Sequence, residues 1–235
     1  MRVRGEPWLD VWTLRLANVV PADSLSRWSS VLSLPELQRA ARFRHASRRA
    51  QAIASRALLR HCLSERLGKR PGAWRIEADA HGRPQLEPRS SEIDFNTSHT
   101  DGMVVCAVSN GFPVGVDVEH LDRAKEIAGV AGRFLSEEEQ LAWQAKPADA
   151  ANLFLLQLWT LKEALAKAEG LGLQIDFTGL SIHQDATNNF RLAADNRWRL
   201  FTRRSHSGYV MAAVCQPNEP VRPAWRDGAA VLGPV

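Results

Sequence analysis

Cysteine is scarce in this sequence and forms no recognisable disulfide or metal pattern. Cys62, Cys106 and Cys215 are widely spaced, and the last two lie in the apolar segments MVVCAV and MAAVC. An odd number of cysteines at wide spacing excludes a disulfide framework, and no zinc-binding spacing is present. We therefore predict that the cysteines are small buried core residues.

Long apolar runs are also missing. No segment approaches the ~20 consecutive apolar residues that a membrane-spanning helix needs, and the N-terminal segment MRVRGEPWLDVW lacks the apolar run of a secretory signal. Hydrophobic residues make up 45% of the 235 residues and charged residues 24%, which is ordinary for a globular protein. We expect a cytoplasmic protein without a membrane partner, built as one large or two small domains.

Acidic residues are nearly absent from one long stretch. Residues 39–70 contain ten basic residues and a single acid, Glu65. The stretch therefore has a net charge of +9, which leaves −5 for the remainder of a chain whose total is +4. Such a patch suits a polyanion, which could be nucleic acid, a phosphorylated small molecule or an acidic protein. The basic residues are Arg39, Arg42, Arg44, Arg48, Arg49, Arg56, Arg60, Arg66, Lys69 and Arg70.

The hydrophobic pattern predicts an α+β fold. Long helices are expected over residues 47–67 and 149–169, each followed by a glycine that can end it, Gly68 and Gly170. Short strands are expected between and after these helices. The segments MVVCAVS and VGVDVE are expected to form a strand pair around an Asn-Gly turn.

The two halves of the chain resemble each other faintly. Each contains a long helix, short strands and a Ser-His pair before an apolar strand. We therefore predict two similar α+β lobes, residues 1–112 and 113–220, followed by a loose tail rich in proline and glycine over residues 221–235.

Three carboxylates lie in two segments with clear periodicity. In VGVDVE, Asp117 and Glu119 project from the same face of a strand, roughly 7 Å apart. Two such carboxylates can share one hard cation, although a solvent-facing strand edge would show the same pattern. In LWTLKEALAKAEGLGL, Glu163 and Lys167 share one helix stripe, with Lys162 beside it. An ordinary Glu-Lys pair on an exposed helix face is the alternative.

Two other segments carry groups that can bind phosphate. FNTSHT places Ser98 and His99 at a strand-to-turn junction, and HGRPQL presents Arg83 on a tight turn. A hydrolytic triad at Ser98 is disfavoured because no nucleophile-elbow pattern surrounds it. The alternatives are a histidine that caps or packs, and an arginine that is simply exposed.

Taken in order and at these separations, the motifs resemble the 4'-phosphopantetheinyl transferase superfamily. They are Gly-Arg-Pro, Phe-Asn-x-Ser-His, Gly-Val-Asp-x-Glu and Trp-x-x-Lys-Glu-Ala-x-x-Lys, followed by Gly-x-Gly-Leu at residues 170–173. The resemblance covers roughly residues 35–215 and is to the larger branch, the surfactin-synthetase-activator (Sfp) type. Thr97 and Thr100 depart from the residues usual at their positions.

The resemblance implies an enzyme that transfers 4'-phosphopantetheine from coenzyme A to a serine of an apo acyl or peptidyl carrier protein, releasing adenosine 3',5'-bisphosphate. It implies Mg²⁺, with Mn²⁺ as a substitute, bound by Asp117, Glu119 and Glu163. Asp117, Glu163 and Lys167 are implied to be catalytic, with Glu163 as a base acting directly or through a metal-bound water. The residues implied to contact coenzyme A are Arg83, Ser98, His99, Lys162 and Lys167, with Arg49 and Arg56 as further candidates.

The resemblance also implies the overall arrangement and the partners. We expect a monomer whose two lobes are related by a pseudo-twofold axis, with the active site in the cleft between them. Its partners would be coenzyme A and acidic carrier-protein domains, with no nucleic acid. The alternatives are a metal-dependent hydrolase of pyrophosphate bonds, which needs no carrier, and a basic nucleic-acid-binding module, for which no recognition motif is present.

Overall fold

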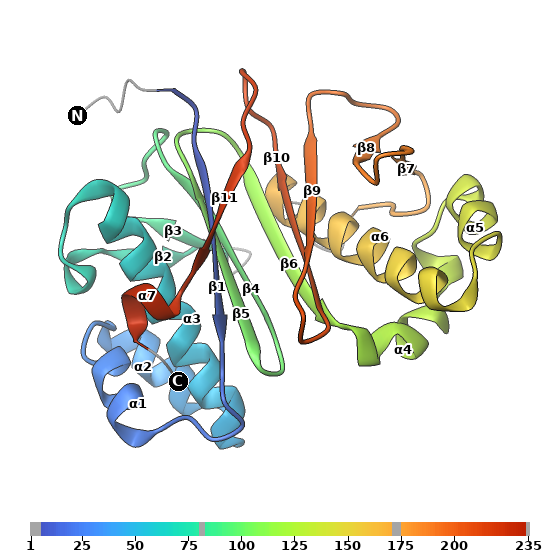
Figure 1. The fold of residues 1–235 in the computed structure, drawn as a ribbon. Helices are drawn as coiled ribbons and strands as arrows, with labels where there is room; N and C mark the ends of the chain where they lie inside the picture. The colour runs from blue at the N-terminus through green and yellow to red at the C-terminus, as the bar shows by residue number, and fades with distance from the viewer. Residues whose placement is uncertain (1–5, 80–82, 171–174, 234–235) are drawn as a thin grey trace. The chain divides into compact units, whose positions relative to one another are not determined.

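The chain forms two units that each combine helices with antiparallel strands. The computed structural model describes residues 6–79, 83–170 and 175–233. Unit 1 comprises Met1–Gly111 and Ala224–Val235, and unit 2 comprises Phe112–Pro223. This composition confirms the predicted α+β class (Figure 1). Among the described residues, no helix is long and apolar enough to cross a membrane.

Unit 1 is built on a four-stranded antiparallel sheet. The strand order is β11-β1-β5-β4, with the bounds β1 Leu9–Arg15, β4 Asp94–Thr100, β5 Met103–Ser109 and β11 Pro223–Asp227. The 22-residue helix α3, Ala46–Leu67, packs on β5. Helices α1 (Ala22–Ser29) and α2 (Leu34–Ala41) pack on α3, and a small hairpin joins β2 (Ile76–Ala78) to β3 (Pro84–Leu86).

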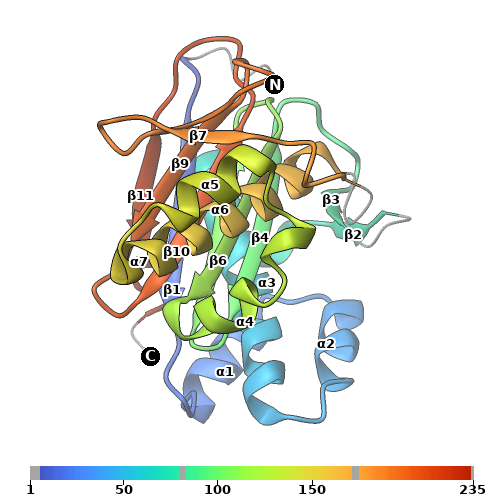
Figure 2. The ribbon, with the colours of Figure 1, turned by 90° about the vertical axis from the view of Figure 1, so that its right-hand side faces the viewer.

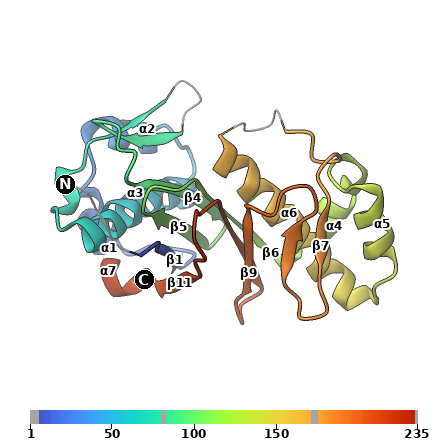
Figure 3. The same ribbon diagram turned by 90° about the horizontal axis from the view of Figure 1, so that it is seen from above.

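Most of residues 221–233 form a strand and a short helix, which corrects the predicted loose tail. Strand β11 pairs at the edge of the sheet beside β1, and the short helix α7, Ala229–Leu232, packs on α3 (Figure 3). The Trp28 indole donates to the Leu232 carbonyl oxygen at 3.1 Å. Arg226 donates to Asp10, a carboxylate that is 1% exposed, at 3.1 Å. A buried charge and a buried indole thus hold the segment in place.

Unit 2 is built on a five-stranded sheet covered by one long helix. The strand order is β6-β10-β9-β8-β7, with the bounds β6 Val114–His120, β7 Ile182–Gln184, β8 Phe190–Leu192, β9 Arg199–Arg204 and β10 Tyr209–Cys215. Helix α6, Ala148–Glu169, packs against β6 and β10 (Figure 2). The shorter helices are α4 (Ala124–Ala128) and α5 (Glu137–Gln144).

Local sequence signals explain where the long helices end. Gly68 and Gly170 follow α3 and α6 with a φ of +73° each, the left-handed conformation that glycine adopts at least cost. These two helix ends are therefore confirmed. The apolar faces of the helices lie in two separate cores, one in each unit.

The expected pairing of the segments around residues 110–113 is wrong. Strand β5 pairs with β1 and β4, whereas β6 pairs with β10, about 90 residues later in the chain. Every residue of β5 is buried, as are six of the seven in β6. Two adjacent apolar strands in sequence therefore belong to different sheets.

Candidate active site

Helix α6 and strand β6 approach each other unusually closely in unit 2. A Cβ atom added to Gly115 would lie 1.9 Å from the Ala164 carbonyl oxygen and 2.7 Å from the Ala168 nitrogen. Both neighbours are backbone atoms, so only glycine fits at this point of β6. The close approach places the carboxylates of β6 against the stripe of α6 that carries Glu163 and Lys167.

The three predicted carboxylates interact with one another. Asp117 and Glu119 on β6 are 5% and 7% exposed. Burial raises the pKa of Glu119, and the charge of Asp117 raises it further. Burial likewise raises the pKa of Glu163, with added effects of Asp117 and Glu119, while Lys167 opposes them. Like charges gathered in a poorly hydrated site explain these shifts.

Two cations hold the carboxylates of β6. Lys167 Nζ donates to Asp117 Oδ1 at 2.7 Å and to the Val116 carbonyl oxygen at 3.2 Å. Arg123 Nη1 donates to Glu119 Oε1 at 2.5 Å, and the same guanidinium binds Glu126 at 3.0 Å. The sequence analysis placed Lys167 at the site but did not include Arg123. The sequence signal for Arg123 is its position four residues after Glu119.

The donor chemistry of this cluster suits a hard divalent cation. Three carboxylate oxygen donors without histidine or cysteine favour Mg²⁺ or Mn²⁺ over zinc. Within the described part of the chain, however, no three such side chains are already arranged to hold a metal ion. Because Asp117 and Glu119 bond to Lys167 and Arg123, their carboxylates would have to turn to share a cation. Burial and the neighbouring carboxylates both raise the pKa values of Glu119 and Glu163, and a bound cation would oppose both effects.

The structure contradicts the prediction that Lys162 binds coenzyme A. Its side chain is 0% exposed. Lys162 Nζ lies 2.6 Å from Glu139 Oε2 and 2.6–2.7 Å from the carbonyl oxygens of Phe134, Phe177 and Leu180. These acceptors satisfy the ammonium completely, since it has three protons. Lys162 therefore anchors α6 within unit 2 rather than meeting a ligand.

Glu139, which the sequence did not single out as a partner of Lys162, completes this anchor. It also accepts hydrogen bonds from the Ser136 and Ile182 nitrogens at 2.8 Å each, while Ser136 caps α5 in return. The buried pair therefore ties α5, α6 and β7 together. The Ser-Glu-Glu-Glu sequence at residues 136–139 is typical of a capping box, but the sequence does not indicate that Glu139 also binds Lys162.

The predicted phosphate-binding residues of unit 1 lie on β4 and beside β3. Ser98 is buried and His99 is exposed, as expected for successive strand residues, which point to opposite faces. The two side chains thus do not share one face of the sheet. Arg83 is largely buried and donates to both oxygens of Asp94 at 3.1 Å, so a phosphate there would compete with a carboxylate. Gly82, Gly172 and Leu173, which belong to the quoted motifs, lie outside the described residues.

Unit 1 also contains a basic pocket of about 1050 Å³. The guanidinium of Arg56 is the notable group: its Nη1 is buried without a hydrogen-bond partner among the described residues, and burial lowers its pKa. Arg60, by contrast, is bound by Glu36 and by the Pro71 and Trp74 carbonyls. Arg49 does not line the pocket and donates to the Phe43 carbonyl oxygen. The arginines of the pocket are Arg39, Arg42, Arg56, Arg60 and Arg75.

Comparison with known proteins places both units in one family. Residues 21–111 match the model described as 4'-phosphopantetheinyl transferase, N-terminal, and residues 113–214 match the 4'-phosphopantetheinyl transferase superfamily. The chain belongs to the 4'-phosphopantetheinyl transferase superfamily, which confirms the family predicted from the motifs.

Two curated relatives support this assignment. The chain is 32% identical over 165 residues to the 4'-phosphopantetheinyl transferase HetI of Nostoc sp., covering 69% of each protein. It is 28% identical over 211 residues to the 4'-phosphopantetheinyl transferase Sfp of Bacillus subtilis, covering 88% of this chain and 92% of that one. A holo-[acyl-carrier-protein] synthase structure from Neisseria meningitidis is 23% identical, with a TM-score of 0.40 over 45% of this chain and 98% of that one.

Proposed function

We propose that this enzyme transfers the 4'-phosphopantetheine group of coenzyme A to a serine hydroxyl of an apo carrier protein. Adenosine 3',5'-bisphosphate would be the second product. Membership of the family supports the reaction class. The observation that carries the site assignment is the cluster of Asp117, Glu119, Glu163 and Lys167, drawn together by the close packing of β6 on α6.

Asp117, Glu119 and Glu163 would hold Mg²⁺, or Mn²⁺ in its place. The bound cation would neutralise charge on the pyrophosphate of coenzyme A and orient it. Lys167 is already beside Asp117 at 2.7 Å, where its ammonium could move to a phosphate oxygen. Its role would be to stabilise the negative charge that develops on the departing phosphate.

Glu163 is the candidate general base. In the proposed step, the serine oxygen forms a bond to the phosphorus that carries pantetheine. The pyrophosphate P–O bond breaks, and its electron pair leaves with adenosine 3',5'-bisphosphate. The serine proton passes to the Glu163 carboxylate, either directly or through a water held by the cation.

The basic pocket of unit 1 supports coenzyme A as the donor. A guanidinium whose Nη1 is buried without a partner among the described residues, in a pocket with further arginines, is suited to phosphate because charge-assisted hydrogen bonds would offset its desolvation. We infer that Arg56 contacts a phosphate of coenzyme A. Inorganic phosphate could also bind the Arg56 guanidinium. The test of Arg56 therefore measures the affinity for intact coenzyme A.

The test follows adenosine 3',5'-bisphosphate by chromatography, with and without an apo carrier protein. Glu163→Gln and Lys167→Ala should each slow carrier-dependent release by ~10² or more. Glu138→Gln, at an exposed position on α5, is the control and should behave as wild type. Release that needs no carrier would indicate the pyrophosphate hydrolase instead. Normal turnover by Glu163→Gln and Lys167→Ala would refute the site.

A further inference from the structure

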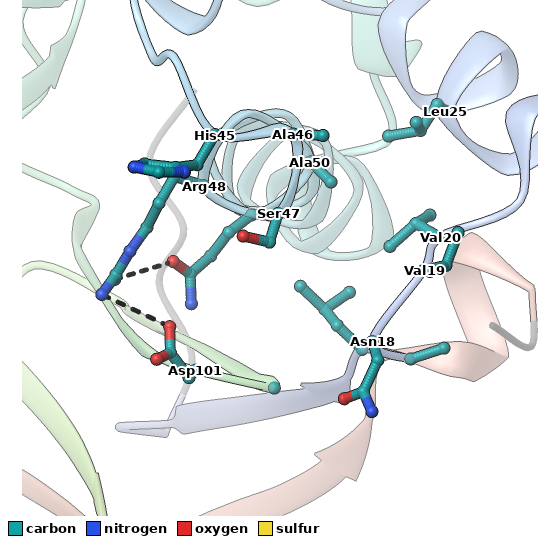
Figure 4. Close-up of a pocket in the computed structure, with 14 residues that line it drawn as sticks. Asn18, Val19, Val20, Leu25, His45, Ala46, Ser47, Arg48, Ala50 and Asp101 are labelled. Carbon is teal, nitrogen blue, oxygen red and sulfur yellow. Dashed lines mark hydrogen bonds and ion pairs between the residues drawn. The ribbon is translucent and has the colours of Figure 1, made fainter.

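A second pocket of unit 1, of about 420 Å³, lies at the start of helix α3. Its walls are the segment after β1, the first turns of α3 and the turn between β4 and β5 (Figure 4). One side is apolar and includes Leu16, Val20, Leu25 and Ala50. At its rim, Val19 is 84% exposed, the highest value among the exposed large hydrophobic residues of the described chain.

The opposite side of this groove is polar, with Arg48 and His45 beside a single acid, Asp101. Arg48 extends along this side toward Asp101, and it bonds Gln51 at 3.3 Å and Asp101 at 3.4 Å (Figure 4). Arg44, His45 and Arg49 flank Arg48 in the sequence, and the first turn of α3 contains no acidic residue. Asp101, at 84% exposed, is the only acid among the groove residues, so its surface pair with Arg48 is weak and exchangeable.

This arrangement is unfavourable for an isolated helix. The N-terminal end of a helix carries partial positive charge, so arginines in the first turn are repelled by it and by one another. Helices α1, α2, α4 and α5 each have an acid in the first turn, which is the usual arrangement. Carboxylates brought by a partner would relieve this repulsion at α3, and they would meet an apolar wall beside it.

We propose that this groove docks an acidic amphipathic helix of the apo carrier protein. The apolar stripe of the helix would lie on Val19, Val20 and Leu25, and its carboxylates would replace Asp101 on Arg48, as in other helix-in-groove interfaces. The identity of the partner rests on the proposed function. Nucleic acid is disfavoured because the apolar wall of the groove has no Phe, Tyr or Trp side chain for base stacking among its described residues.

The location agrees with a substrate role. The turn residue Asp101 follows Ser98 by three positions, a distance of about 10 Å along an extended chain. The Gln51 side chain donates to the Thr100 carbonyl oxygen and so fixes the start of α3 to the end of β4. A docked carrier would therefore lie beside the Ser98–His99 segment that the motifs associate with coenzyme A.

The experiment measures steady-state transfer with Val19→Asp and Arg48→Glu. Both side chains are exposed, so the fold should tolerate the changes. Each variant should raise KM for the carrier about 10-fold, with kcat and KM for coenzyme A within about twofold of wild type. Leu141→Asp and Arg197→Glu are matched controls, being an exposed apolar residue and an exposed arginine paired with an aspartate in unit 2. Both controls should keep the wild-type KM.

The outcomes separate this inference from the proposed function. An unchanged carrier KM in both variants, with normal transfer by wild type, overturns the docking site alone. A rise in KM for coenzyme A instead of the carrier also overturns the docking site. The site is likewise overturned if an RNA duplex displaces the carrier from wild type and Arg48→Glu no longer binds that duplex. If wild type transfers nothing, binding of a fluorescent apo carrier decides: binding lost in Val19→Asp upholds the site, and equal binding refutes it.

Discussion

Substituting Gly115 by alanine tests whether the contact between β6 and α6 builds the site. The added methyl carbon would lie 1.9 Å from the Ala164 carbonyl oxygen. Ordinary close carbon–oxygen contacts are about 3.3 Å, so the two backbones must separate by roughly 1.4 Å. Because both obstructing groups belong to the backbone of α6, a side-chain rotation cannot relieve the clash.

The size of the effect follows from this displacement. Overpacking of a well-packed core costs ~1–3 kcal/mol, and we expect the upper part of that range, about 2–3 kcal/mol. For a protein of this size a loss of 1 kcal/mol lowers Tm by roughly 2–4 °C. A misplacement of about 1 Å reduces the rate of a positioned reaction by ~10²-fold. Gly115→Ala should therefore lose both stability and transfer activity.

The assays are thermal unfolding and carrier phosphopantetheinylation, with Gly132→Ala as the control. Gly132 also lies in unit 2, but an added Cβ there would meet nothing within 4 Å. The control should match wild type in both assays. A Gly115→Ala enzyme with wild-type Tm and normal transfer would show that β6 and α6 are not in close contact, and the site geometry would have to be abandoned.

Three other substitutions test single charges. Lys162→Met should lose ~3–5 kcal/mol in urea unfolding, because it strands the buried Glu139 carboxylate; a loss below about 1 kcal/mol would contradict the anchor. Glu163→Gln should stabilise the protein at pH 8. The folded-state pKa of Glu163 is raised, so the stability that its proton provides is lost as pH rises through that pKa, whereas glutamine stays neutral. Parallel Tm curves for wild type and Glu163→Gln from pH 4 to 8 would contradict this shift. Arg56→Ala should weaken coenzyme A binding in calorimetry by ~10-fold or more, and unchanged affinity would exclude Arg56 from the site.

Much of the architecture could be predicted because local signals and packing agree. The two long helices combine apolar periodicity with a terminal glycine, and each packs on the sheet of its own unit. The predicted pairing of β5 with β6 was wrong because two apolar strands joined by the short turn at residues 110–113 predict a hairpin whether or not the strands share a sheet. The prediction of a loose tail was wrong because it used only the proline and glycine content of the segment. The ion pair between Arg226 and the buried Asp10 joins distant parts of the chain, which local composition does not indicate.

The sequence could predict which site residues share a face, because strand and helix periods fix the direction of each side chain. It could not predict contacts with residues that lie far away in the sequence. Asp117, Glu119, Glu163 and Lys167 follow strand and helix periods, and the structure brings them together. Lys162 has the same residue type as Lys167 and the same motif, but only its three-dimensional surroundings show that it is buried against Glu139 and three carbonyl oxygens. Motif membership therefore located the helix but could not tell a ligand-binding lysine from a structural one.

The most direct test of the central claim is the intact mass of an apo carrier protein after incubation with this enzyme, coenzyme A and Mg²⁺. An acyl carrier and a peptidyl carrier would be tested separately, each with an EDTA control. We predict that at least one carrier gains a single phosphopantetheine group, and that EDTA abolishes the gain. Carriers of unchanged mass, with adenosine 3',5'-bisphosphate released from coenzyme A in their absence, would contradict the proposed transfer.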